Sequence, residues 1–205
     1  MMWGALRADW RLYCALHFPH GAGALRRALL CCHSRGLLIL ATHRIGHYYL
    51  ALRRRHGWTP ATVALRALLL PLRVLAIVIA KSDVAASTTV APGVYLSERG
   101  QLTVRAQNIG SGTVIHDRVT IGVSATGEGP PDIGNDVWIG PDCVIYGNVR
   151  LGTGATLLPG TVIATSVADH DLVGGNPATV LRNGFDNREL RRTLAPSVTR
   201  ESLLT

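Results

Sequence analysis

The chain has 205 residues, 47% of them hydrophobic, which is enough for one compact domain with a smaller attachment. Its formal net charge of +8 comes almost entirely from arginine, because Lys81 is the only lysine. This balance favours phosphate-bearing or acidic partners. No aromatic-basic patch or nucleic-acid motif accompanies the charge, so we expect no nucleic-acid partner.

The cysteines indicate a reducing compartment. Their spacing resembles no zinc site, and the adjacent Cys31 and Cys32 are poorly suited to a disulfide. Residues 1–10 lack a signal-peptide pattern, so we predict a cytoplasmic protein. The apolar stretch Ala67–Ala80 contains Pro71 and Arg73 and is too short to span a bilayer. A membrane role is therefore not expected.

The first eighty residues are predicted to be helical. Turn sequences at residues 19–21 and 57–60 separate the helices. The predicted helices are Trp10–Leu16, Ala24–Cys32, Gly36–Arg55 and Ala61–Ala80. We assign residues 1–81 to an N-terminal α-helical domain.

From residue 84 onward, aliphatic residues recur every six positions, with one slip and one skipped step. A period of six fits neither a helix nor simple strand alternation, but it is the signature of a parallel β-helix with three short strands per coil. Small or β-branched residues stand two positions before several of these aliphatic residues, Cys143 among them. The aliphatic series is Val84, Val90, Leu96, Leu102, Ile109, Ile115, Ile121, Ile133, Ile139, Ile145, Leu151, Leu157 and Ile163.

The hexad region spans residues 82–166 and is interrupted at 122–132. The glycines and the adjacent Pro130 and Pro131 in this interruption predict an extruded loop. Residues 167–205 form the third part of the chain: 167–183 are predicted to cap the coil, and a polar, arginine-containing tail begins at Asp186.

Three segments of this sequence resemble the serine acetyltransferase branch of the left-handed β-helix acyltransferases. They are RGLLILATHRIGHYYL at 35–50, the coil sequences VTIG at 119–122 and IGNDVWIGPDCVIYGNVRLGTGATLLPGTVI at 133–163, and the closing motif GGNPATVL at 174–181. The resemblance covers most of the chain and implies a mainly β protein: a left-handed parallel β-helix with an N-terminal α-helical domain. It also implies acetyl transfer from acetyl-CoA, a co-substrate rather than a tightly bound cofactor, to a hydroxyl.

The sequence departs from this family at the catalytic histidines. The family places an Asp-His pair after a GxxL segment and a second histidine in the extruded loop. Here the first place reads GVYLSERG, with Ser97 and Glu98 where Asp and His would stand, and the loop contains no histidine. Because of this departure, the resemblance does not establish serine as the acceptor.

The hexad register offers a replacement base. One full coil separates Leu96 from Ile115, so Ile115 is predicted to stack on Leu96 about 4.8 Å away, which places His116 above Ser97. Imidazole is suited to take the proton of an attacking hydroxyl, and Glu98 or Asp117 would stabilise its protonated form. We therefore hypothesise that His116 is the general base.

Other interpretations of the titratable residues stay open. His116 at a turn is also compatible with a solvated or backbone-bonded side chain, and Glu98 is an alternative base. His17, His20 and His170 are weaker candidates for acceptor contact or chemistry. His43 and His47 lie four residues apart on a predicted helix, but no third ligand accompanies them, so we predict no metal.

The resemblance also implies coenzyme A contacts. Gly122 matches the glycine whose N–H faces the thioester carbonyl. Pro141 and Pro159 match residues of the pantetheine groove, where proline keeps its carbonyl but has no N–H to donate. Gly175, Asn176, Pro177 and Ala178 match the closing motif beside the cofactor. Arg182, together with Arg188, Arg191 or Arg192, would hold the ribose phosphate.

The expected partner is the chain itself. The resemblance implies a homotrimer with active sites between subunits, and a pairing of trimers into a hexamer through the N-terminal helices. The predicted function is acetyl-CoA-dependent O-acetylation of a small hydroxyl acceptor such as serine or a related amino acid. A sugar or polysaccharide O-acetyltransferase and a non-catalytic scaffold are the alternatives.

Overall fold

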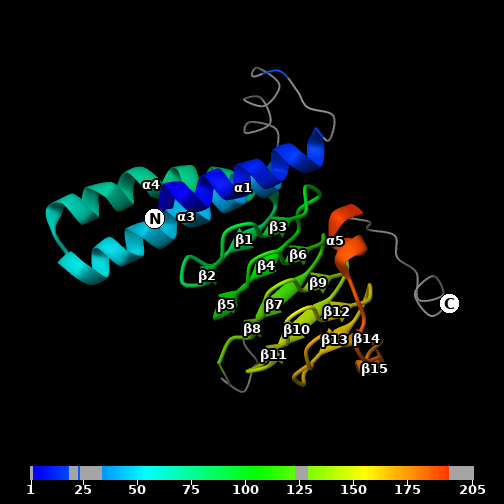
Figure 1. Cartoon of the computed structure of the whole chain (residues 1–205). Helices are drawn as coiled ribbons and strands as arrows, with labels where there is room; N and C mark the ends of the chain where they lie inside the picture. Colours follow the sequence, from blue (N-terminus) through cyan, green and yellow to red (C-terminus); the bar gives the residue numbers. More distant parts are fainter. Residues whose placement is uncertain (1, 19–22, 24–33, 123–128, 194–205) are drawn as a thin grey trace.

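A computed structural model of the chain describes residues 2–18, 23, 34–122 and 129–193. Three long helices rest on one end of a parallel β-helix, and a short C-terminal helix lies along its side (Figure 1). The predicted helix Ala24–Cys32 and most of the predicted extruded loop lie outside the described residues. The fold is the left-handed parallel β-helix with an N-terminal helical region that the sequence predicted.

The N-terminal helices are α1 (Met2–His17), α3 (Arg35–His56) and α4 (Pro60–Ala80). Helix α3 begins after Ser34, whose hydroxyl accepts a hydrogen bond from the Leu37 N–H. Helix α4 begins with Pro60 and a capping box between Thr59 and Thr62. The helical region ends at Ala80 and the first strand begins at Asp83. The division into domains near residue 82 stays a prediction.

Helix α4 corrects one expectation. The helix predicted at Ala61–Ala80 is present, and Pro71 and Arg73 do not interrupt it, so the expectation that its apolar stretch is too short to span a bilayer is wrong. By length and composition it could cross a membrane, and only 11% of its most apolar window is buried. Among the described residues it is the one helix with this property.

The β-helix has three sheets, each built from one side of the successive coils. One contains β1 (Asp83–Val84), β4 (Thr103–Val104), β7 (Thr120–Gly122), β10 (Val144–Tyr146) and β13 (Val162–Ile163). The second contains β2 (Thr89–Val90), β5 (Asn108–Ile109), β8 (Asp132–Ile133) and β11 (Arg150–Leu151). The third contains β3 (Tyr95–Leu96), β6 (Val114–Ile115), β9 (Trp138–Ile139), β12 (Thr156–Leu157), β14 (Leu172–Gly174) and β15 (Thr179–Arg182). Only β14 and β15 pair antiparallel among these strands, and this hairpin closes the coil.

The predicted aliphatic column forms the core. Leu96, Ile115, Ile139 and Leu157 follow one another in register through four coils of the third sheet, each almost fully buried. One position differs. The strand residue in β4 is Val104, which pairs with Val84 and Ile121, whereas Leu102 is buried two residues earlier. The sequence analysis treated this region as one slip of a single residue. In the structure, the step from Leu96 to Val104 is longer than the usual six residues, and the step from Val104 to Ile109 is shorter. Gly100 and Gln101, both at positive φ, lie in the turn within the longer step.

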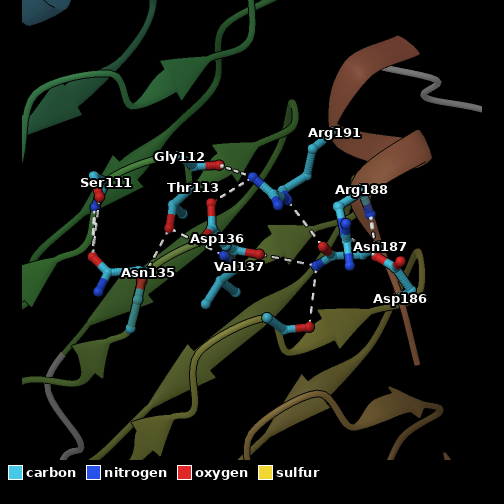
Figure 2. A network of polar contacts seen from close by, with 12 residues as sticks. Ser111, Gly112, Thr113, Asn135, Asp136, Val137, Asp186, Asn187, Arg188 and Arg191 are labelled. Carbon is cyan, nitrogen blue, oxygen red and sulfur yellow. Dashed lines mark hydrogen bonds and ion pairs between the residues drawn. The ribbon is translucent and has the colours of Figure 1, made fainter. Parts of the chain in front are cut away.

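The C-terminal segment contains a short helix that the sequence analysis treated as tail, α5 (Arg188–Thr193). Figure 2 shows how it is held. The Asn187 amide donates to the carbonyls of Asp136 and Gly154, at 2.9 and 3.1 Å. The Arg191 guanidinium pairs with the Asp136 carboxylate at 2.5 Å. These contacts fix the segment against the turns that precede β9 and β12.

Helix α3 approaches the β-helix most closely at Gly36. A Cβ at Gly36 would collide with the carbonyl of Leu96 and the hydroxyl of Tyr13, which itself bonds the Leu96 backbone. We expect Gly36→Ala to lower the free energy of unfolding by about 1–3 kcal/mol, because the packed backbone must shift. Chemical denaturation measures this loss.

Gly46 in the same helix is the matched control. A Cβ there would meet only the Cβ of Ala86 at 3.4 Å, an ordinary contact. Gly46→Ala should leave stability unchanged or raise it by roughly 0.5–1 kcal/mol, through the helix propensity of alanine. Equal effects at the two positions would contradict the proposed close approach at Gly36.

Candidate active site

The predicted catalytic residues and half of the predicted cofactor residues lie in one column of turns, whereas Gly122 ends β7 in the first sheet. These turns follow β3, β6, β9, β12 and β14, and we call them the turn column: residues 97–101, 116–118, 140–142, 158–160 and 174–176. Backbone hydrogen bonds join successive turns, for example from Asp142 N to Asp117 O at 3.2 Å and from Gly160 N to Pro141 O at 2.9 Å. Residues far apart in sequence therefore form a single edge of the β-helix.

His116 lies where the register placed it, one coil beyond Ser97. Its backbone N–H donates to the Ile139 carbonyl, while Ser97 N–H donates to the Ile115 carbonyl. The imidazole is buried against the Trp138 ring, with ring centroids 4.9 Å apart. Burial lowers the pKa of His116 to about 4, despite the opposing charge of Asp117. The ring is thus neutral near pH 7, as a general base requires.

The surroundings of His116 are closed. Its Nε2 is buried without a hydrogen-bond partner, and so are Trp138 Nε1 and Thr156 Oγ1 nearby on the same sheet. An acceptor hydroxyl reaches this nitrogen only if Trp138 or a covering segment moves. Burying three polar atoms without hydrogen-bond partners is costly.

The two predicted carboxylates make other contacts. The Asp117 carboxylate pairs with Arg118 at 2.7 Å. The Glu98 carboxylate accepts from Ser34 Oγ at 2.5 Å and from Gly36 N at 3.5 Å, at the positive end of helix α3. In the described structure, Glu98 does not contact His116.

Glu98 faces a histidine that the sequence analysis ranked low. His17 Nε2 lies 3.8 Å from Glu98 Oε1, and both side chains are partly open to solvent, at 33% and 27% exposure. The other ring nitrogen, Nδ1, lies 3.0 Å from the Tyr13 carbonyl, which can only accept, so Nδ1 carries the proton in this contact. The free lone pair of neutral His17 is then on Nε2, beside a carboxylate. In a Ser-His-Asp triad the carboxylate holds the other ring nitrogen, whereas Glu98 lies beside Nε2 itself, so an acceptor hydroxyl would have to approach Nε2 next to Glu98.

The structure places the predicted cofactor residues as follows. Gly122 ends β7, and a Cβ there would meet no atom of the described residues within 4 Å. Pro141 is buried and its carbonyl is occupied by Gly160, whereas Pro159 is exposed. In the closing motif, the Gly175 carbonyl and the Ala178 N–H both bond Val162. The side chains of Asn176, Pro177 and Arg182 are exposed.

The tail arginines lie at the edge that precedes the third sheet, away from the turn column. Arg191 pairs with Asp136 in a turn before the third sheet, whereas the turn column follows that sheet. Arg188 pairs with Asp186 at 3.2 Å. Together with Arg192 they line a cavity of about 470 Å³ that also contacts Leu12 and Tyr95. Arg191 is therefore engaged in holding α5, which leaves Arg182 as the arginine nearest the closing motif.

Two buried histidines predict a pH-dependent stability. Burial lowers the pKa values of His43 and His116 to about 4, whereas the unfolded chain protonates them near 6.5. The unfolded state therefore binds more protons between these values, and stability falls as the pH drops from about 6.5 toward 4. Each residue should account for roughly 2 kcal/mol at pH 5.

Denaturation midpoints at pH 7.5 and pH 5 measure this effect. His43→Gln and His116→Gln should each flatten the pH dependence of the wild-type chain. An unchanged slope in both variants would show that the two imidazoles are protonated in the folded state.

Comparisons with known proteins agree with this architecture. Residues 130–165 match the family model described as bacterial transferase hexapeptide (six repeats). Serine acetyltransferase 4 of Arabidopsis thaliana is 36% identical over 102 residues, covering 45% of this chain and 28% of the relative. A chloramphenicol acetyltransferase of Agrobacterium fabrum is 40% identical over 55 residues, covering 27% and 26% of the two chains.

Solved structures show the same fold. The serine acetyltransferase from Vibrio cholerae superposes with a TM-score of 0.76 at 18% identity, covering 96% of this chain and 71% of that one. The enzyme from Brucella abortus gives 0.69 at 21%, covering 88% and 68%. The fold and repeats thus define a hexapeptide-repeat β-helix protein. Within this class, the chain resembles the serine acetyltransferase branch in sequence and in fold. The matched segments span only 26–28% of the two curated relatives.

Proposed function

We propose that the chain is an acetyl-CoA-dependent O-acetyltransferase for a small hydroxyl acceptor, serine or a related amino acid. The observation that carries the proposal is the turn column, where the predicted catalytic residues lie in register with Pro141, Pro159 and the start of the closing motif. The relatives support it: the Brucella abortus serine acetyltransferase has been solved with coenzyme A, and that of Neisseria gonorrhoeae with serine.

The chemistry follows from the groups present. An imidazole takes the acceptor proton while the hydroxyl oxygen attacks the thioester carbonyl carbon. The Gly122 N–H is proposed to stabilise the oxyanion that forms. Collapse of this intermediate breaks the carbon–sulfur bond, and the imidazolium returns its proton to the departing thiolate. The products are the acetyl ester and free coenzyme A.

Two imidazoles are candidates for the base. His116 was the choice from sequence, and it is neutral but closed in the described protomer. The His17 side chain is partly exposed, and its Nε2 lies 3.8 Å from Glu98, which stands where the resemblance places the family histidine. Because the His17 side chain is the more accessible of the two, we favour His17 as the base, with Glu98 as its partner.

A hydroxyl acceptor other than an amino acid is the second candidate. The residues that the serine branch uses at the acceptor are replaced here by Ser97 and Glu98. Relatives with the same repeats include chloramphenicol acetyltransferases and a probable macrolide acetyltransferase, whose names indicate larger acceptors. These observations support a larger hydroxyl acceptor, such as a sugar, as the second candidate.

The proposed assembly is a homotrimer with active sites between subunits, located in the cytoplasm. Helix α1, which exposes Trp3, would then join two trimers into a hexamer. The buried Cys143 thiol, which donates to the Leu158 carbonyl at 3.2 Å, is compatible with a reducing compartment.

The acceptor is identified by thiol release. The purified chain is mixed with acetyl-CoA and, in turn, serine, homoserine and nucleotide sugars, and free coenzyme A is measured with a thiol reagent. Release with serine or homoserine supports the first candidate, and release with sugars alone supports the second. No release with any acceptor overturns the enzymatic proposal in favour of a scaffold.

A further inference from the structure

Helix α4 has an apolar face that the rest of the described protomer leaves uncovered. Its packed side carries Thr62, Ala76 and Ala80, which are buried. The opposite side carries large hydrophobic side chains that are about half or more exposed: Val63, Leu68, Leu70, Leu72, Val74, Leu75, Val78 and Ile79. A continuous row of exposed large apolar side chains on one helix face indicates an interaction site.

Cations border this face. Helices α3 and α4 contain no aspartate or glutamate at all. Helix α3 ends in Arg53, Arg54, Arg55 and His56, and Arg66 lies in α4. The guanidinium groups of Arg53 and Arg66 lie 5.0 and 5.8 Å from the Trp58 ring centroid, and Trp58 is 64% exposed. Exposed tryptophan beside arginine is typical of the region where lipid headgroups meet acyl chains.

A groove between the two helices combines the same features. It has a volume of about 210 Å³ and is lined by leucines, including Leu50, Leu69 and Leu70, with Arg53 and Arg66 among its other residues. Apolar walls beside guanidinium groups fit an acyl chain joined to a phosphate. Figure 1 shows α3 and α4 side by side, extending beyond the β-helix, which leaves the hairpin accessible to a surface.

The charges argue against a second copy as the occupant. A twofold pairing of identical α4 faces would bring two sets of arginines together with no described acidic residue of these helices to neutralise them. A membrane-spanning arrangement is also disfavoured. Arg73 pairs with Asp83 of β1 at 3.0 Å, and Ala76 and Ala80 are buried, so one side of α4 stays attached to the protein.

We propose that the α3–α4 hairpin binds the surface of a bilayer containing anionic phospholipid. The apolar face of α4 lies in the interface, and Arg53, Arg54, Arg55 and Arg66 contact lipid phosphates. This attachment is independent of the proposed acetyl transfer and would hold the catalytic region beside a membrane.

Vesicle co-sedimentation of the full chain tests the proposal. We expect the protein to pellet with phosphatidylcholine vesicles that contain phosphatidylglycerol, and much less with phosphatidylcholine alone. Leu68→Asp combined with Leu75→Asp should reduce the bound fraction at least about tenfold, because two charges enter the interface. Replacing Arg53, Arg54 and Arg55 with glutamine should remove the preference for phosphatidylglycerol.

Val180→Asp is the matched control, since Val180 is an exposed apolar residue in β15 at the other end of the molecule. It should bind vesicles like the wild type, and circular dichroism confirms folding of each variant. Absence of vesicle binding, or equal binding by the α4 variant, would overturn the proposal. Sedimentation velocity tests whether the α4 face instead joins copies of the chain. If the α4 substitutions dissociate a larger assembly without changing vesicle binding, the lipid proposal is wrong.

Discussion

Replacing His17 with glutamine is expected to lower kcat by about 10²–10⁴, the usual contribution of a general base. The reason is geometric: the His17 side chain is 33% exposed and its Nε2 lies beside Glu98, whereas His116 Nε2 is buried. Glu98→Gln should cost less, since it removes the neighbouring carboxylate but leaves the base in place. Steady-state thiol release, with the acceptor found by screening, gives these values.

His116→Gln is the matched comparison. If the role of His116 is to pack against Trp138, this variant keeps most of its turnover. Any loss of turnover should then parallel a loss of thermal stability. If His116→Gln remains folded and loses activity while His17→Gln does not, the base is His116, as the sequence suggested, and the closed face must open during turnover.

Removing the Asp9 charge is expected to be the most destabilising of the substitutions considered. Asp9 is fully buried and pairs with Arg44 at 3.1 Å. Its carboxylate also accepts from Gly93 N at 3.0 Å, and Arg44 donates to the carbonyls of Val90 and Ala91. The cluster therefore joins α1, α3 and the turn after β2. Asp9→Asn leaves the Arg44 charge without a counterion in a buried site, which typically costs about 3–5 kcal/mol. Urea denaturation measures the loss.

Two further variants separate this charge effect from general damage. Asp142→Asn removes an ion pair to Arg118 in which both partners are about half exposed, and it should barely change the denaturation midpoint. The double variant Asp9→Leu with Arg44→Met removes both buried charges and should be less destabilised than Asp9→Asn. If Asp9→Asn matches Asp142→Asn, the buried pair does not stabilise the junction.

The coil was predictable because it depends on a local repeat. Every buried strand residue, such as Ile115 or Ile139, repeats the environment of the residue one coil earlier, so the sequence period reports the stacking directly. The β4 register was not predictable in the same way. Placing Val104 rather than Leu102 in the strand requires Gly100 and Gln101 to adopt positive φ. A glycine in the sequence signals such a turn, but the glutamine at position 101 does not.

The candidate site was predicted in part for a similar reason. The turn column follows from the period, so the position of His116 one coil beyond Ser97 was predicted correctly, while its role stays a prediction. The contact between His17 and Glu98 joins residues 81 positions apart in separate parts of the fold, and no local pattern encodes it. A signal was present: Tyr13 and His17 lie four residues apart on one helical face, but the predicted helix ended at Leu16, before His17.

Equilibrium binding of coenzyme A tests the central claim most directly, because it does not depend on the acceptor. Titration calorimetry of the wild-type chain should show saturable binding, weakened at least tenfold by Arg182→Glu, which reverses the charge beside the closing motif. No binding of coenzyme A or acetyl-CoA at millimolar concentration would contradict an acetyl-CoA-dependent enzyme, whatever acceptor is offered.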